Sequence, residues 1–415
     1  MATILEYSKK RLQAFLEDIS HLKGLEFPYP HSQQALEQIH DTLSNHLKAV
    51  EQLTEKSDPA TVRAACKAAV SALFIYLPLL GFILRSTDVR NAFEIYRPLL
   101  RLSRQILGPS AKLILSSEWD YSPFTYLNIP ILQEFVLIGL PAPESANPLL
   151  VSLAGHELGH PVWLQQRLAM NVSPEIESKI LAEIQDGRWK EYSELFPTVK
   201  KDALTTDLFA KQTWLPAHEW ALWQSEETFC DFLGLRILGE SYLHAFAYLL
   251  APNQGGGYRP VIYPNVKRRV GNLVNAAKEY QTPVPPNYEE LFEDLPQPTD
   301  AYPQTKFLLE LADAASQSVV LMLIKIANTV VNDAKIEEGN EDRVQAICKD
   351  FRDYIVPARD PVGLSDILNA GWKAFHDPNL WAEHPEIRDR DRTLKELLLK
   401  SIEVLEFKSI MKGSE

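Results

Sequence analysis

Two histidines and a glutamate stand close together in the segment His156-Glu157-Leu158-Gly159-His160. Residues four apart on a helix share one face and lie about 6 Å apart along the axis, so His156 and His160 can direct ring nitrogens at one metal ion. Glu157 lies at the edge of that face, where its carboxylate reaches a water on the metal more readily than the metal itself. The spacing therefore predicts two zinc ligands and a general base.

The residues around this segment favour a helix that begins at Asn147-Pro148, a capping residue followed by proline in the first turn. Pro161 directly follows the second histidine. Because proline lacks an N–H and clashes with the preceding turn, we expect the helix to stop or kink there. Gly159, between the partners, allows another backbone to approach closely.

A second polar pattern occurs downstream, in the segment 225–234. We expect a helix from about Pro216 to Leu238, closed by Gly239. On that helix Glu227 and Asp231 fall on one face. A catalytic zinc site needs about three protein ligands and one open position, so a further carboxylate near the histidines is of interest.

Together, the HExxH segment and the later helical E-x-x-x-D resemble the gluzincin zinc peptidases, the broad group that includes thermolysin. The resemblance implies that Glu157 is the base, that Glu227 is the third zinc ligand and that Asp231 orients a ligand histidine. Ligand imidazoles usually donate their second N–H to a carboxylate, which agrees with that role for Asp231. The resemblance covers two helices, and the long stretch 161–224 between them contains its own helix and would suit a lid or a specificity element.

A third segment, Tyr263 to Leu273, is similar to the His-Pro…Arg-Ile stretch that follows the zinc helices in some HExxH peptidases, with Tyr263 in place of histidine. A tyrosine hydroxyl there can hydrogen-bond the oxyanion of a tetrahedral intermediate. Tyr258, beside three glycines, is an equal competitor for this role. The alternative is that Tyr263 is an ordinary packed tyrosine.

Other interpretations of these residues stay open. The histidine helix can be an ordinary amphipathic helix with a solvated polar face, and Asp231 a simple surface acid. We expect Glu226 to be the surface residue beside Glu227, although the two can exchange roles. Cys230 is interpreted as a small core residue. His218 precedes Glu227 by nine residues, about 13 Å of helix, which is too far for both to bind one metal, so we expect a structural or substrate contact.

Composition narrows the class of protein. The chain has 415 residues and a formal net charge of −13, which disfavours nucleic acid as a partner. The charged N-terminus does not resemble a signal peptide, and three distant cysteines fit a reducing cytoplasm. The uncharged stretch Ala68 to Leu84 is at the short limit for spanning a bilayer, so we expect a buried core helix and no membrane partner.

The pattern of elements predicts a mostly helical α+β protein. We expect a helical N-terminal domain (1–107), a zinc-peptidase core with a small sheet (108–281), a Pro-rich linker (282–303) and a helical C-terminal domain (304–415). The short apolar runs 112–115 and 135–140 suit strands.

These observations lead to one expected function, a cytoplasmic zinc-dependent metallopeptidase that uses Zn²⁺ and acts on a protein or peptide. Zinc would polarise the scissile carbonyl, and Glu157 would move the proton from water to the leaving amine. Two rivals remain: a catalytically silent regulatory or scaffolding protein on the same fold, and a zinc hydrolase of non-peptide amides. The helical terminal domains would suit a protein partner. We find no obvious fourth ligand near the motifs, which favours catalysis over a structural zinc site.

Overall fold

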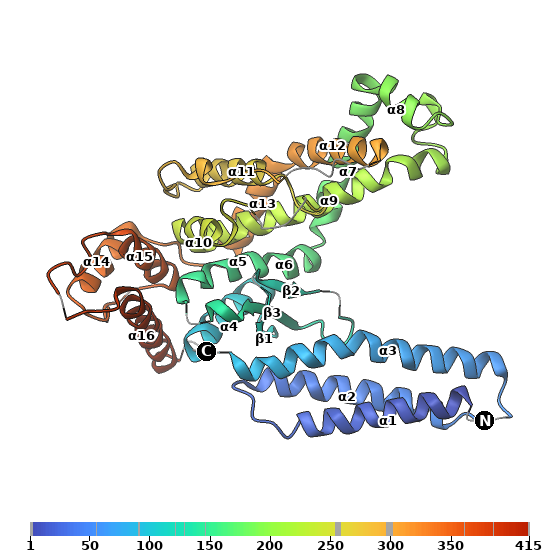
Figure 1. Cartoon of the computed structure of the whole chain (residues 1–415), viewed down its shortest axis with the longest axis horizontal. Coiled ribbons are helices and arrows are strands. Elements are labelled where there is room, and N and C mark those ends of the chain that lie inside the picture. Colours follow the sequence, from blue (N-terminus) through green and yellow to red (C-terminus); the bar gives the residue numbers. More distant parts are fainter. Residues whose placement is uncertain are drawn as a thin grey trace. The chain divides into compact units, whose positions relative to one another are not determined.

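A computed structural model describes residues 3–54, 56–89, 92–120, 122–127, 129–145, 147–253, 259–295, 302–360, 362–384 and 386–413. The chain divides into two compact units. The first comprises residues 1–104 and 109–146, and the second comprises residues 105–108 and 147–415. Both consist mainly of helices (Figure 1), and the only strands described form one three-stranded sheet, which confirms the mostly helical α+β class.

The first unit contains three long helices that lie side by side, followed by a shorter helix and the sheet (Figure 1). Its helical elements are α1 (Ile4–Leu22), α2 (Pro30–Glu51), α3 (Pro59–Arg85), η1 (Ser86–Asp88), most of α4 (Ala92–Leu107) and η2 (Ala142–Glu144). Asp58 caps α3 through the N–H of Thr61, as its Asp-Pro start predicts. Apolar residues at three- and four-residue spacing, such as Leu36, Ile39 and Leu43 of α2, are fully buried.

The sheet has the order β1-β3-β2. β1 (Lys112–Glu118) pairs in parallel with β3 (Phe135–Pro141), and the short β2 (Phe124–Tyr126) pairs antiparallel with β3. Both predicted strands are confirmed. The sheet groups with the N-terminal helices, however, whereas the sequence favoured a place beside the histidine motif in residues 108–281. The reason is that β1 packs against α2 and α3.

The regular elements described in the second unit are all helices, and they are organised around one long helix, α9 (Leu208–Leu238) (Figure 1). Helices α5, α6, α7, α12 and α13 all contact α9. The elements before α9 are η3 (Pro148–Leu153), α5 (Ala154–Glu157), α6 (Gly159–Gln165), α7 (Leu168–Ala182), the π-helical turn η4 (Glu183–Gly187), α8 (Trp189–Leu195) and η5 (Lys201–Ala203). Those after it are α10 (Glu240–Leu250), α11 (Val266–Glu279), η6 (Tyr288–Leu291), α12 (Pro303–Ser318), α13 (Val320–Asp333), α14 (Glu341–Arg352), α15 (Leu364–His376) and α16 (Arg390–Met411).

Several helix ends differ from their predicted positions. The helix after Asn147 is interrupted at Leu158 and resumes, so Pro161 falls in the first turn of α6, where its missing N–H has no intrahelical role. α9 begins at Leu208, eight residues before the predicted Pro216, because Asp207 caps the N–H groups of Phe209 and Ala210. Its predicted end is confirmed, since Gly239 has a φ of +66°.

Two further departures concern α7 and the Pro-rich segment. α7 begins at Leu168, after left-handed Arg167, and runs through Ser173-Pro174, a pair that is more typical of a helix start. The predicted linker is not simply extended, because η6 within it buries Tyr288 in the second unit. Residues 296–301 of the same segment lie outside the described residues. Residues 304–413 belong to the same compact unit as the histidine motif.

Among the residues that the structure describes, one helix is long and apolar enough to cross a membrane, by length and composition alone: α3 with η1, Pro59–Asp88. The pair α12 and α13, bent by 49° at Val319, passes the same test as a broken span. Core helices of soluble proteins also pass it. One face of α3 packs into the first unit through Cys66, Ala69 and Phe82, while Phe74 on another face is exposed. The expectation of no membrane partner therefore stays a prediction.

Candidate metal centre

The histidine motif lies where two helical segments cross with almost no side chain between them. A Cβ atom added to Gly155 would lie 2.9 Å from the Cα of Gly234, and one added to Gly159 would lie 2.7 Å from the Cα of Cys230. These distances are too short for any larger residue. The glycines therefore bring α5 and α6 against α9 and place His156 and His160 opposite the acidic turn of α9.

Glu227 lies between the two histidines. Its carboxylate oxygens are 3.4 Å from Nε2 of His156 and 3.8 Å from Nε2 of His160. The two imidazole rings are nearly perpendicular, with their centroids 5.1 Å apart. The structure thus brings together all three residues for which the sequence predicted a role as zinc ligands.

The opposite nitrogen of each imidazole faces a second carboxylate. Nδ1 of His156 is 2.9 Å from Asp231, and Nδ1 of His160 is 2.9 Å from Glu226. When each Nδ1 donates its proton to a carboxylate, the lone pair of Nε2 is left directed at Glu227. Glu226 is only 19% exposed at its side chain, so it is not the surface residue that the sequence suggested.

Arg269 closes the cluster from α11. Its guanidinium donates to both oxygens of Asp231, at 2.5 and 2.8 Å, and approaches Glu227 at 3.5 Å. The hydroxyl of Tyr242 donates to Asp231 at 2.7 Å. The local sequence explains this placement, because Asn265 caps α11 through the N–H of Arg268 and sets the phase of the helix.

The buried charges shift one another's pKa values. Burial disfavours the charged form of His156, but hydrogen bonds to Asp231 and Glu227 outweigh it and raise the pKa of His156 to about 10. Burial likewise opposes ionisation of Asp231, yet the charge of Arg269 holds the pKa of that carboxyl well below its usual value. Burial also opposes ionisation of Glu227, but the hydrogen bond and charge of His156, together with the charges of Arg269 and His160, outweigh it and lower the pKa of that carboxyl.

The donor set fits a divalent cation. Glu157, Glu226, Glu227 and Asp231 supply four carboxylates against the single guanidinium of Arg269, a surplus of negative charge when both imidazoles are neutral. Two imidazole nitrogens and one carboxylate form a ligand set known from catalytic zinc sites. Glu157, the predicted base, is buried beside these residues, with 4% of its surface exposed.

Cys230 is a second candidate for the third ligand. Ligand atoms of His156, His160 and Cys230 all lie within 4.8 Å of one another. The thiol packs against the backbone of Gly159, however, whereas the carboxylate of Glu227 faces both Nε2 atoms. Burial, with the charge of Glu227, raises the pKa of the Cys230 thiol. Geometry therefore favours Glu227.

Two predicted neighbours of the site have different outcomes. The ring of Tyr263 lies against Arg269, with the guanidinium carbon 5.7 Å from the ring centroid, so Tyr263 borders the cluster. Its competitor Tyr258 lies outside the described residues. His218 contacts Ser173 of α7 at 3.0 Å, a link between two helices.

Sequence reasoning missed the roles of Glu226, Arg269 and Tyr242. A signal for Glu226 was present, because two ligand histidines require two partners for their second ring nitrogens and only Asp231 had been assigned. Arg269 lies in the segment whose resemblance was noted, but no carboxylate partner could be named for it. Tyr242 lies in α10, four residues beyond the end of α9. Nothing in its local sequence indicates that its hydroxyl reaches Asp231.

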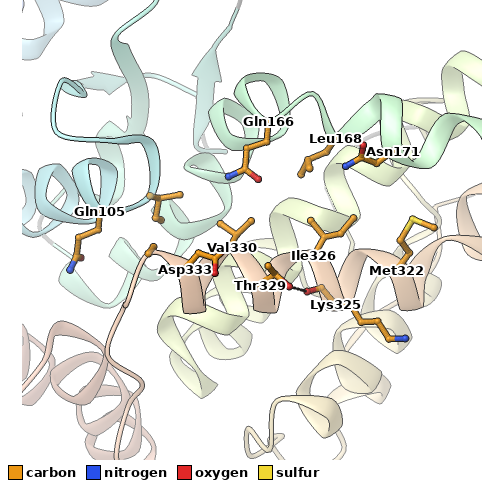
Figure 2. Close-up of a pocket in the computed structure, with 12 residues that line it drawn as sticks. Gln105, Gln166, Leu168, Asn171, Met322, Lys325, Ile326, Thr329, Val330 and Asp333 are labelled. Atoms are coloured by element: carbon orange, nitrogen blue, oxygen red, sulfur yellow. Dashed lines mark hydrogen bonds between the residues drawn. The ribbon is translucent and has the colours of Figure 1, made fainter.

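A separate pocket of about 480 Å³ lies along one face of α13 in the second unit (Figure 2). Ile326 and Val330 contribute apolar surface, and Gln166, Asn171 and Lys325 contribute polar groups. None of the residues of the candidate metal centre lines this pocket.

The sequence matches no family model, no curated protein and no solved structure in the three comparisons made.

Proposed function

We propose that this protein is a zinc-dependent metallopeptidase of the gluzincin type. The observation that carries the proposal is the convergence of His156 Nε2, His160 Nε2 and the Glu227 carboxylate, with each opposite nitrogen held by its own carboxylate. His156, His160 and Glu227 would hold the ion. Zinc bound there would supply a Lewis acid for a substrate carbonyl and for water.

The remaining residues support that role through position and charge. Asp231 and Glu226 fix the orientation and tautomer of the two imidazoles, and Arg269 keeps Asp231 ionised at the centre of the cluster. Such outer carboxylates raise the basicity of ligand histidines. Without Arg269, Asp231 would be a buried carboxylate with too few partners, which is costly.

We assign proton transfer to Glu157. Its carboxylate is buried next to the first histidine and on the edge of the face that carries both, where it accepts a proton from the attacking water and delivers it to the leaving amine. Tyr263, against Arg269, is our candidate for a hydroxyl that donates to the developing oxyanion.

The test combines metal analysis with cleavage-site profiling of the full chain. We expect about one zinc per chain at this centre, cleavage of some members of a broad peptide library, loss of cleavage on chelation and its return with added zinc. A protein that holds zinc but cleaves no peptide would support the silent scaffolding alternative. A protein that holds no zinc would overturn both.

A further inference from the structure

A second pair of histidines lies in the second unit, where α10 meets the end of α15. Nδ1 of His244 and Nε2 of His376 face each other at 3.2 Å. Neither residue belongs to the candidate metal centre, and the proposed function makes no use of them. The question is whether this pair is only a hydrogen bond or a place for an ion.

Both rings are held in position by one buried tryptophan. Trp372 is 2% exposed and anchored through its indole N–H to the carbonyl of Leu149. The ring of His244 stacks on it at 5.3 Å and 19°, and the ring of His376 stacks on it at 5.8 Å and 22°. The two nitrogens therefore face each other because both rings pack on the same surface.

The other nitrogen of His244 faces a carboxylate. Nε2 of His244 is 3.6 Å from Glu240, one turn earlier on α10. At this distance the carboxylate is an ionic neighbour of Nε2 and not a hydrogen-bond partner, and its negative charge favours a cation beside the ring. Nδ1 is the atom of His244 that faces His376.

The distance between the two nitrogens suits tetrahedral coordination. Zinc–nitrogen bonds of about 2.0–2.1 Å at a tetrahedral angle place two ligand nitrogens roughly 3.3 Å apart, close to the 3.2 Å observed. His376 is exposed at the end of α15, so water can complete the coordination.

We infer that His244 and His376 form a second binding site for a zinc-class divalent ion, open to solvent and supported by Glu240 and Trp372. An ion there would join α10 to the end of α15, a contact already made by Asn369, which bonds the N–H of Ser241 and the carbonyl of Leu238. The inference does not depend on peptidase activity or on the first centre.

Equilibrium dialysis of the full-length protein against micromolar Zn²⁺ tests the inference. Wild type is expected to bind a second equivalent, and His244→Gln and His376→Gln are each expected to weaken that equivalent at least tenfold. His384→Gln removes an exposed histidine paired with Glu386 in the same unit and serves as the matched control, with both equivalents retained. Because His376 lies at an exposed helix end, its substitution should leave the far-UV circular dichroism unchanged.

The first centre is separated from the second by a double variant. His156→Ala with His160→Ala should lose the first equivalent and keep the second. Retention of both equivalents in His376→Gln would place the second ion elsewhere. Binding of no second equivalent by wild type would reduce the pair to a hydrogen bond and overturn the inference.

Discussion

Two buried histidines, one in each unit, show opposite responses to burial. His31 of the first unit and His156 of the second are 6% and 9% exposed. Nδ1 of His31 accepts from the N–H of Leu113 at 3.1 Å and is 2.6 Å from the hydroxyl of Tyr96. Burial lowers the pKa of His31 below its usual 6.5, whereas the carboxylates around His156 raise its pKa to about 10.

The difference supports our proposal that His156, and not His31, is a metal ligand. Around His31 the polar groups are neutral, and the nearby charges of Arg104 and Lys112 also disfavour a proton there. Around His156 the carboxylates exceed the available cations, and Nε2 faces Glu227 and a second imidazole. Burial therefore does not distinguish a structural histidine from a ligand, but the charge that surrounds it does.

The largest expected effect is on metal content. His156→Ala combined with His160→Ala removes two of the three proposed ligands, so zinc at this centre should fall from about one equivalent to almost none, and elemental analysis should find only zinc bound at the His244–His376 pair. His31→Gln is the matched control, because it removes a histidine of similar burial from the first unit and should leave zinc content unchanged. Equal zinc loss in the two proteins would show that the surroundings of His156 and of His31 do not differ in metal binding.

The next effect separates chemistry from coordination. Glu157→Gln keeps the size of the side chain and removes the base, so peptide turnover should fall by about 10²–10⁴, towards the upper end because the same group serves the leaving amine. Zinc content and thermal stability should barely change. The paired measurement is zinc stoichiometry and turnover on any cleaved peptide. Wild-type turnover in a zinc-loaded Glu157→Gln protein would remove Glu157 from the mechanism while leaving the metal centre intact.

A smaller effect distinguishes the two neighbouring glutamates of α9. Glu226→Ala removes the partner of His160 Nδ1 and should weaken zinc binding by about 10–100-fold. Glu227→Ala removes a ligand and should weaken it further. Competition with a zinc indicator measures both, and Cys230→Ser serves as the control for the alternative thiol ligand. A Cys230→Ser protein as weak as Glu227→Ala would transfer the third position to the thiol.

Much of the local architecture followed from the sequence. The predicted runs 112–115 and 135–140 lie within the longer strands β1 and β3, and Asp58, Asn265 and Gly239 stand at the helix ends where short-range capping rules place such residues. Helix starts were less predictable, because a proline is compatible with a first turn and also with a longer helix. Pro216 and Pro174 both lie inside helices that begin earlier.

The clustering of the candidate site residues was predictable wherever the residues concerned lie within one or two turns of a single helix. His156, His160, Glu227 and Asp231 were found through their spacing and the resemblance that it supports. Contacts between distant segments were beyond reach, because Arg269 reaches Asp231 only through the packing of α11 on α9. The grouping of the sheet with the N-terminal helices is likewise a result of packing, which no local pattern in residues 108–141 specifies.

The smallest expected effect tests the other side of the comparison, the neutral state of His31. Since its folded pKa lies below its unfolded value of about 6.5, the unfolded chain takes up a proton first as the pH falls. This residue's contribution to stability is therefore complete above about pH 6.5 and is lost as the pH drops from there through the folded pKa.

Urea unfolding at about pH 7.5 and about pH 5.5 measures the change. Between these two pH values the free energy of unfolding of His31→Gln should fall less, or rise more, than that of wild type, because the variant has no proton to take up at that position. His46→Gln, which removes a half-buried histidine from the same helix, is the control and should keep the wild-type change. If the stability of His31→Gln and of wild type changes equally between the two pH values, the folded protein does not hold His31 in its neutral form. The comparison of the two buried histidines would then depend on His156 alone.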